Sequence, residues 1–217
     1  MPYGECWQLQ QRLFGEVLRA KQEGGAAVCG HLLLVEHPAV YTLGKSGRES
    51  NLLVTEEYLR GLGAEYYHID RGGDITFHGP GQVVGYPILD LERAGLGLKE
   101  YVAALEQAVI DTVGLYGIAA GRIDGASGVW VDEKSTRPRK ICAIGVRASR
   151  YVTMHGFALN ASTDLRWFGY INPCGFTDRG VTSIAAETGE RPDADKLKER
   201  LTDALNANLG NVKIYKN

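Results

Sequence analysis

Apolar residues recur at helical spacing in three long stretches of the chain. Residues 5–22, 98–116 and 193–209 each carry apolar side chains three or four positions apart, which places them on one helix face. Pro192-Asp193 is a typical start for the last of these helices, and Gly210 is a typical end. The pattern therefore predicts three amphipathic helices, each with one buried face.

Shorter apolar runs indicate extended structure. Short helices are predicted at 55–61, where Thr55 is a suitable cap, at 164–168 and at 181–187. Strands and helices are mixed without strict alternation, which favours an α/β protein of the α+β type, a mixed β-sheet flanked by helices. One domain spanning 1–217 is preferred to a separate C-terminal unit from about residue 180. The predicted strands are 31–36, 40–43, 65–69, 82–89, 128–131, 141–148 and 151–159.

Composition narrows the class of protein further. The 217 residues are 44% hydrophobic and 23% charged, with a formal net charge of −2. This balance is expected of a globular protein, whereas a general nucleic-acid binder is normally basic. No apolar run approaches the roughly 20 residues of a membrane span, and the N-terminus lacks the pattern of a signal peptide. We therefore expect a cytoplasmic protein without disulfides and without nucleic-acid or membrane partners.

Residues 71–82, with the sequence Arg-Gly-Gly-Asp-Ile-Thr-Phe-His-Gly-Pro-Gly-Gln, form the most unusual segment of the chain. Four glycines alternate here with a guanidinium, a carboxylate and an imidazole. A turn needs only one or two glycines, whereas this mixture suits a site where backbone approaches a ligand and polar groups converge on it. The segment is therefore predicted to form part of a binding site.

Cys174 is a candidate nucleophile. It lies between a proline and a glycine in Asn172-Pro-Cys-Gly175, shortly before the helix predicted at 181–187. A positive helix end near a thiol favours the thiolate. The alternative, a small buried hydrophobic residue, stays equally open on local sequence. The other cysteines lie in or beside apolar stretches and are expected to be structural: Cys6, Cys29 and Cys142.

Lys140 and two histidines are weaker candidates. Lys140 directly precedes an apolar strand, where a partly desolvated amine exchanges protons near neutral pH, but local sequence alone favours an ordinary solvated lysine. His78 and His155 each precede a glycine, a position that suits substrate orientation, acid–base catalysis or a simple turn. The spacing of cysteines and histidines matches no metal-binding motif, so no metal is expected.

A cationic stretch contrasts with the slightly acidic chain. Six basic residues and no acid occur between positions 134 and 150. They form either a solvated loop and strand edge or a docking surface for an acidic protein partner. The six are Lys134, Arg137, Arg139, Lys140, Arg147 and Arg150.

Several motifs, taken in order, are similar to those of one known family. They are residues 71–82, residues 140–145 (Lys-Ile-Cys-Ala-Ile-Gly), residues 155–160 (His-Gly-Phe-Ala-Leu-Asn), and Pro-Cys-Gly at 173–175 followed by Val-Thr-Ser-Ile at 181–184. Together they closely resemble the octanoyltransferase family of lipoate biosynthesis, also called lipoyl(octanoyl) transferases. The resemblance spans about residues 5–210, and several motifs in order are far more specific than any one of them.

The resemblance implies a fold similar to biotin and lipoate protein ligase catalytic domains, and an acyltransferase activity. It implies octanoyl-acyl carrier protein as donor and a lysine of lipoyl domains as acceptor, in 2-oxoacid dehydrogenase complexes and the glycine cleavage H protein. Cys174 matches the acyl-accepting nucleophile and Lys140 its acid–base partner, and no cofactor is implied. The residues that match segments lining the acyl site are Arg71, Gly72, Gly73, Asp74, Ile75, Thr76, Phe77, His78, Ala143, Ile144, Gly145, Gly156, Phe157 and Ala158.

The implied chemistry is consistent with these residues. A Cys174 thiolate would exchange one thioester for another, a nearly isoergic step that needs no ATP. A Lys140 ammonium would favour the thiolate and move protons. Glycines 72, 73, 145 and 156 would let the acyl chain lie against backbone. Two alternatives remain, an ATP-dependent lipoate or biotin protein ligase-like enzyme and a non-catalytic protein that binds acyl carrier or lipoyl domains.

Overall fold

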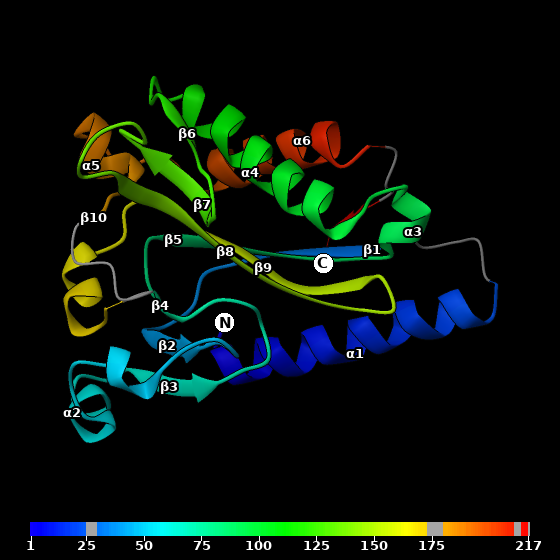
Figure 1. The fold of residues 1–217 in the computed structure, drawn as a ribbon, viewed down its shortest axis with the longest axis horizontal. Helices are drawn as coiled ribbons and strands as arrows, with labels where there is room; N and C mark the ends of the chain where they lie inside the picture. Colours follow the sequence, from blue (N-terminus) through cyan, green and yellow to red (C-terminus); the bar gives the residue numbers. More distant parts are fainter. Residues whose placement is uncertain (25–29, 173–179, 211–213, 217) are drawn as a thin grey trace.

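The computed structural model describes residues 1–24, 30–172, 180–210 and 214–216, arranged as two β-sheets with helices packed around them (Figure 1). Cys29 and Cys174 therefore lie outside the described residues. No helix in the described ranges is long and apolar enough to cross a membrane.

Eight of the described strands form the main sheet. Its order is β11-β1-β5-β9-β8-β7-β6, with β10 paired separately to β8. The β1–β11 and β8–β10 pairs are parallel and the other neighbours antiparallel, which confirms the predicted mixed sheet. The strands are β1 (Gly30–Val35), β5 (Gln82–Leu89), β6 (Ala120–Ile123), β7 (Ala126–Val131), β8 (Arg139–Ser149), β9 (Val152–Asn160), β10 (Gly180–Val181) and β11 (Ile214–Lys216).

Helices cover both faces of the main sheet (Figure 1). Helices α4 (Leu98–Gly114) and α6 (Ala194–Asn208) pack together on one face, and α1 (Tyr3–Gln22) lies along the other. The apolar stripes predicted from sequence are the faces they bury, because removing this apolar surface from water is the main stabilising term. Buried stripe residues include Cys6, Leu13 and Val17 on α1, Tyr101, Leu105, Val109 and Val113 on α4, and Leu197, Leu201 and Leu205 on α6.

A smaller sheet lies beside the main one. Strand β2 (Val40–Leu43) is its centre, parallel to β3 (Glu65–His68) and antiparallel to β4 (Ile75–His78). Helix α2 (Glu56–Gly61) and the 3-10 helix η2 (Leu165–Tyr170) contribute to its core, and a second 3-10 helix, η1 (Glu49–Asn51), precedes α2. Thr55 caps α2 as predicted, since its Oγ1 accepts a hydrogen bond from the backbone N–H of Tyr58 at 3.2 Å.

The structure differs from the predicted elements at several places, among them β11 and η1, which were not predicted. Strand β4 lies inside the glycine-rich segment 71–82, where the glycines concealed its alternating pattern. Strand β6 and helix α3 (Leu91–Ala94) are too short for a periodic signal. The helix predicted at 181–187 is wrong at its start, because Val181 pairs with β8 and α5 (Ile184–Thr188) begins after Ser183, whose Oγ caps it.

Candidate active site

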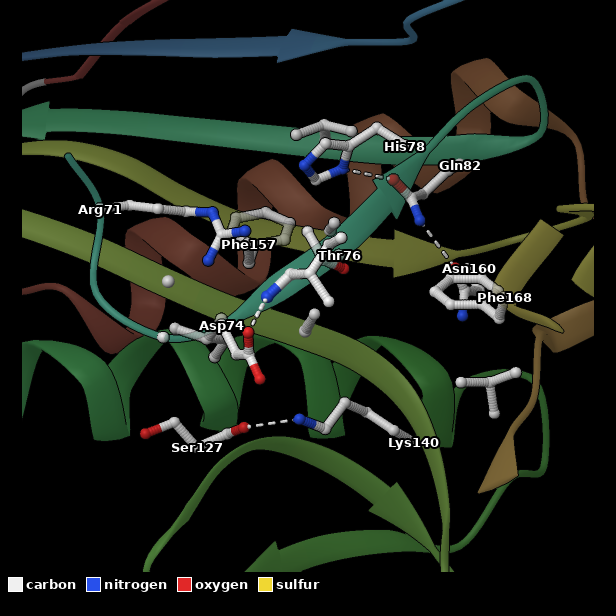
Figure 2. Close-up of a pocket in the computed structure, with 18 of the residues that line it drawn as sticks. Arg71, Asp74, Thr76, His78, Gln82, Ser127, Lys140, Phe157, Asn160 and Phe168 are labelled. Carbon is white, nitrogen blue, oxygen red and sulfur yellow. Dashed lines mark hydrogen bonds between the residues drawn. The ribbon is translucent and has the colours of Figure 1, made fainter. Parts of the chain in front are cut away.

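A cavity of about 630 Å³ is lined by residues of both sheets. Figure 2 shows part of its wall, with side chains from the glycine-rich segment facing Lys140 and Ser127. Lys140 lines this cavity. Phe77, which was also predicted to line the acyl site, does not. The residues matched to an acyl site that line the cavity are Arg71, Gly72, Gly73, Asp74, Ile75, Thr76, His78, Ala143, Ile144, Gly145, Gly156, Phe157 and Ala158. The segments matched from sequence therefore lie together around one cavity.

Two glycines of this wall are required by the protein's own backbone. The N–H of Gly72 donates to the carbonyl of Val146 at 2.9 Å, and a Cβ on Gly145 would lie only 2.9 Å from the Gly72 oxygen. A Cβ on Gly156 would lie 2.1 Å from the carbonyl oxygen of Gly85 on the neighbouring strand. Glycines 145 and 156 thus allow strands and loop to approach each other; that they also let an acyl chain lie against backbone stays a prediction.

Arg71 brings a buried positive charge to the wall. Its side chain is turned toward β2, where Nη2 donates to the carbonyl of Thr42 at 2.7 Å and to its Oγ1 at 3.0 Å. Its Nη1 donates to the carbonyl of Gly72 at 3.0 Å. Because the guanidinium is 7% exposed and held by these oxygens, it is a fixed feature of the cavity.

His78 belongs to a chain of buried hydrogen bonds (Figure 2). Its Nδ1 lies 2.8 Å from Oε1 of Gln82, whose Nε2 donates to Oδ1 of Asn160 at 2.8 Å. This orientation of the Gln82 amide makes Nδ1 of His78 the donor. Burial, reinforced by the nearby His37, lowers the pKa of His78 to about 3. The imidazole is therefore neutral at physiological pH and suited to positioning.

The same chain of hydrogen bonds continues toward Lys140. Asn160 donates through Nδ2 to the carbonyl of Thr182 at 2.9 Å, and the N–H of Thr182 donates to the carbonyl of Lys140 at 2.9 Å. The glycine-rich segment is thereby connected to the backbone at Lys140 and to the residues that follow the 173–179 segment. Neither Gln82 nor Asn160 was assigned a role from sequence, although each ends one of the family motifs.

Asp74 and Phe77 have mainly structural contacts. The carboxylate of Asp74 accepts hydrogen bonds from the side chain of Asn51 and from the backbone N–H of Ile75. The Phe77 ring stacks on Trp167 with centroids 5.3 Å apart, in the core of the small sheet. Successive side chains of a strand point to opposite faces, so Phe77 faces the core of the small sheet, away from Thr76 and His78, which line the cavity.

His155 also lines the cavity, in an unusual backbone conformation. Its φ of 62° lies in the left-handed region, and the residue is 1% exposed. Nε2 lies 3.1 Å from Oδ1 of Asp70, which also forms an ion pair with Arg147. Burial lowers the pKa of His155 to about 4, although the contact with Asp70 opposes this shift. The pair fixes the start of the glycine-rich segment against β8 and β9.

Lys140 extends over strand β7. Its Nζ donates to the carbonyl of Ser127 at 3.2 Å (Figure 2) and lies 4.5 Å from the centroid of the Trp130 ring. Both neighbours line the cavity with it. Lys140 is half-buried, and the strand pairing brings an aromatic face and a carbonyl to its amine, so it is more than the ordinary solvated lysine that local sequence favours.

Cys174 lies outside the described residues, so the geometry of its thiol is not part of the site described here. The described residues on either side of this segment, Asn172 and Gly180, both line the cavity. The backbone N–H of Asn172 donates to the carbonyl of Asn51 at 2.8 Å, and that of Gly180 to Pro138 at 3.0 Å. The described residues nearest Cys174 on either side of it in the chain are therefore both at the cavity.

The cationic stretch is not one surface. Arg139 pairs with Asp132 and Glu187, and Arg147 pairs with Asp70. Arg139 and Arg147 also lie toward opposite ends of β8, eight positions apart at about 3.3 Å per residue. The exposed cations of the loop before β8 are Lys134 and Arg137, a few positions before the cavity-lining Lys140 in the chain.

No group of three or more His, Cys, Asp and Glu side chains within the described ranges is placed to hold a metal ion. What the described site offers is an apolar pocket with a cationic arginine, a neutral histidine and a lysine on its wall. Its apolar lining includes Val84, Val102, Ile144, Val146, Phe157, Leu165, Phe168 and Ile171. Such a site can enclose an apolar chain and exchange a proton through an amine.

Comparison with known proteins agrees with the resemblance that the sequence motifs indicated. Residues 2–206 match the family model described as "Lipoyl protein ligase A/B catalytic domain". An octanoyltransferase of Bacteroides fragilis is 56% identical over 209 residues, covering 96% of this chain and 94% of that protein. An octanoyltransferase of Flavobacterium johnsoniae is 49% identical over 209 residues, covering 94% of this chain and 90% of that protein.

Solved structures share the fold at low sequence identity. A bipartite lipoate protein ligase from Thermoplasma acidophilum superposes with a TM-score of 0.65 at 14% identity, over 86% of this chain and 72% of that one. A lipoate-protein ligase A bound with ATP gives a TM-score of 0.64 at 16% identity, over 86% and 74%. The predicted likeness to lipoate protein ligase catalytic domains is confirmed at the level of fold.

Proposed function

Because this chain belongs to the octanoyltransferase family, within the lipoyl protein ligase A/B catalytic domains, we propose that it moves an octanoyl group between two carrier proteins. The donor is octanoyl-acyl carrier protein, and the acceptor is a lysine of lipoyl domains in 2-oxoacid dehydrogenase complexes and the glycine cleavage H protein. The protein is an acyltransferase of lipoate biosynthesis.

In the first half of the reaction, the Cys174 thiolate attacks the carbonyl carbon of the carrier thioester. The tetrahedral intermediate collapses, the bond to the carrier sulfur breaks, and the Lys140 ammonium gives that sulfur a proton. The product is an octanoyl thioester on Cys174. One thioester replaces another, so this half requires no input of energy.

In the second half, the amine of the lipoyl-domain lysine attacks the Cys174 thioester. Lys140, now neutral, accepts a proton from the attacking nitrogen, and the bond to Cys174 breaks to release the thiolate. Because an amide is more stable than a thioester, this half drives the transfer. Lys140 ends as an ammonium, ready for the next donor.

One observation carries the proposal. The apolar wall, Lys140 and both described ends of the Cys174 segment border the same cavity. An eight-carbon chain gains about 0.8 kcal/mol for each CH₂ that leaves water, so an apolar pocket of this kind supplies affinity for it. The buried Arg71 and neutral His78 sit on that wall as fixed polar groups.

A ligase reaction is the main competing function, since the fold is shared with lipoate protein ligases. The purified protein is given a lipoyl domain and either octanoyl-acyl carrier protein without nucleotide, or free octanoate with ATP and Mg²⁺. We expect lipoyl-domain octanoylation only with the carrier thioester. Modification only from octanoate and ATP would establish the ligase function, and binding of carrier and lipoyl domain without transfer would establish a non-catalytic role.

A further inference from the structure

The amine of Lys140 has an aromatic neighbour to which the mechanism above assigns no role. Trp130 is paired with Lys140 across strands β7 and β8, and its ring centroid lies 4.5 Å from Nζ. The indole is 3% exposed, and its Nε1 donates to the carbonyl of Ala126 at 3.1 Å, which fixes the ring plane. A cation over an aromatic face is stabilised by the ring quadrupole, most strongly over tryptophan.

The backbone beside Trp130 is shaped to admit the lysine stem. The β7–β8 register shifts between Val129 and Trp130, and Gly128 has a φ of 123°. A Cβ at Gly128 would lie 2.6 Å from the carbonyl oxygen of Cys142 and 3.3 Å from Cε of Lys140. Glycine at this bulge therefore leaves the space that the Lys140 side chain crosses.

A buried carboxylate holds this backbone from the helix side. Glu106 of α4 accepts the N–H of Gly128 through Oε1 at 3.0 Å, and its Oε2 accepts from Nε of Arg122 at 3.0 Å. Glu106 lies on the buried face of α4 and is 8% exposed. The adjacent carbonyl, that of Ser127, is the one that accepts the hydrogen bond from Lys140.

From these contacts we propose that Trp130 is a positioning residue for acyl transfer, which holds the Lys140 amine at the cavity together with the Ser127 carbonyl. The proposal rests on the proposed function, because it acts only through Lys140. Holding an acid–base group in one orientation raises the rate of the chemical steps and leaves donor binding largely unchanged. Although Trp130 also lines the cavity, its effect through Lys140 is therefore mainly on kcat.

The test compares Trp130→Leu with Trp130→Phe, which keeps an aromatic face. We expect Trp130→Leu to lower kcat roughly tenfold, with the KM for octanoyl-acyl carrier protein changed less than about twofold, and Trp130→Phe to recover most of the rate. Urea unfolding checks the fold of each variant, and Trp130→Met, whose longer unbranched side chain adapts better to the space of the indole, replaces the leucine variant if that one does not fold. Equal losses in Trp130→Leu and Trp130→Phe would overturn the proposal.

A double-mutant cycle separates positioning from a general structural role. In a Lys140→Met background, measured as single-turnover acylation of the enzyme, Trp130→Leu is expected to cause no further loss. The same fractional loss in both backgrounds would show that Trp130 acts independently of Lys140 and would overturn the proposal. Full activity of Lys140→Met itself would refute the proposed role of Lys140, and with it this inference. An inactive Lys140→Met beside a fully active Trp130→Leu would refute the inference alone.

Discussion

The side chain of Gln82 donates a hydrogen bond to the side-chain oxygen of Asn160 across strands β5 and β9, at 2.8 Å. On one side of this contact Gln82 accepts from His78, and on the other Asn160 donates to the carbonyl of Thr182. The wall of the cavity and the segment that follows Cys174 are thus joined through two buried amides. Such a network is stabilising only while every member keeps its partner.

Asn160→Ala is expected to weaken both the fold and the site. The change leaves Gln82 Nε2 and the Thr182 carbonyl without this partner, which costs about 1–3 kcal/mol for a buried polar group. We expect a lower free energy of unfolding in urea and a reduced kcat. Asn208→Ala is the matched control, since that half-buried amide joins α6 to Asp111 of α4 and does not line the cavity, so its loss should cost less stability and leave kcat unchanged. A wild-type urea midpoint for Asn160→Ala would contradict this reading.

Gly156→Ala is expected to destabilise the sheet where β5 and β9 approach. A methyl group there would lie 2.1 Å from the Gly85 oxygen and 2.8 Å from Cδ of Pro87, so the strands must separate. Overpacking of this kind typically costs about 1–3 kcal/mol, which urea unfolding would measure. Gly169→Ala provides the control, because Gly169 also lines the cavity but a Cβ there meets nothing within 4 Å. Equal stabilities of the two variants would show that the close approach of β5 and β9 does not prevent a larger residue at position 156.

The long helices could be read from the sequence, whereas the packing of glycines could not. The apolar spacing on α1, α4 and α6 is a local property that survives into the fold, and their buried faces are those predicted. Gly156 looks like any glycine in a strand until Gly85, far away in sequence, is brought beside it. Strand β4 was missed because the glycines around it conceal its alternating pattern, and only its pairing with β2 in the fold reveals it.

The buried histidines predict an acid-sensitive fold. The pKa of His78 is lowered to about 3 and that of His155 to about 4, from 6.5, and burial also lowers the pKa of His37. The unfolded chain therefore binds protons below about pH 6.5 that the folded protein does not. We expect the free energy of unfolding to be nearly constant between about pH 7 and pH 8 and to fall as pH drops from about 6.5 toward 4.

Urea unfolding at pH 7.5 and pH 5 measures this effect. A His78→Gln, His155→Gln double variant should lose less stability between the two pH values than the wild-type protein does, because two of the groups that take up protons on unfolding are gone. Equal wild-type stability at both pH values would show that the histidines do not control the fold in this range.

The exposed charge on the loop at 132–139 predicts an effect on the KM for the donor protein. Arg137 is exposed on this loop, three positions before the cavity-lining Lys140, and its cationic neighbour Arg139 is already paired with two carboxylates. If an acidic carrier docks here, Arg137→Glu should raise the KM for octanoyl-acyl carrier protein roughly fivefold, with kcat unchanged and a weaker dependence on salt. Arg150→Glu, beyond the far end of β8, is the matched control. An identical KM in both variants would place the docking surface elsewhere.

The site was only partly readable from sequence. The four family motifs led to the cavity wall, since motif residues that belong to separate strands converge there. Trp130 and Ser127 acquire their contacts through strand register and a bulge, and no local sequence pattern indicated them. His155 was a candidate from sequence, but its contact with Asp70 depends on the fold. The six-cation stretch looked like one surface because its partners, Asp70 and Glu187, lie far away in sequence.

The central claim is that Cys174 carries the octanoyl group, and intact-protein mass spectrometry tests it most directly. The wild-type protein, Cys174→Ala and, as a matched control, Cys142→Ala are each incubated with octanoyl-acyl carrier protein in the absence of a lipoyl domain. We expect a gain of one octanoyl mass in the wild-type and Cys142→Ala proteins, removed by hydroxylamine as a thioester should be, and no gain in Cys174→Ala. An octanoyl adduct on Cys174→Ala that still passes to a lipoyl domain would contradict the account.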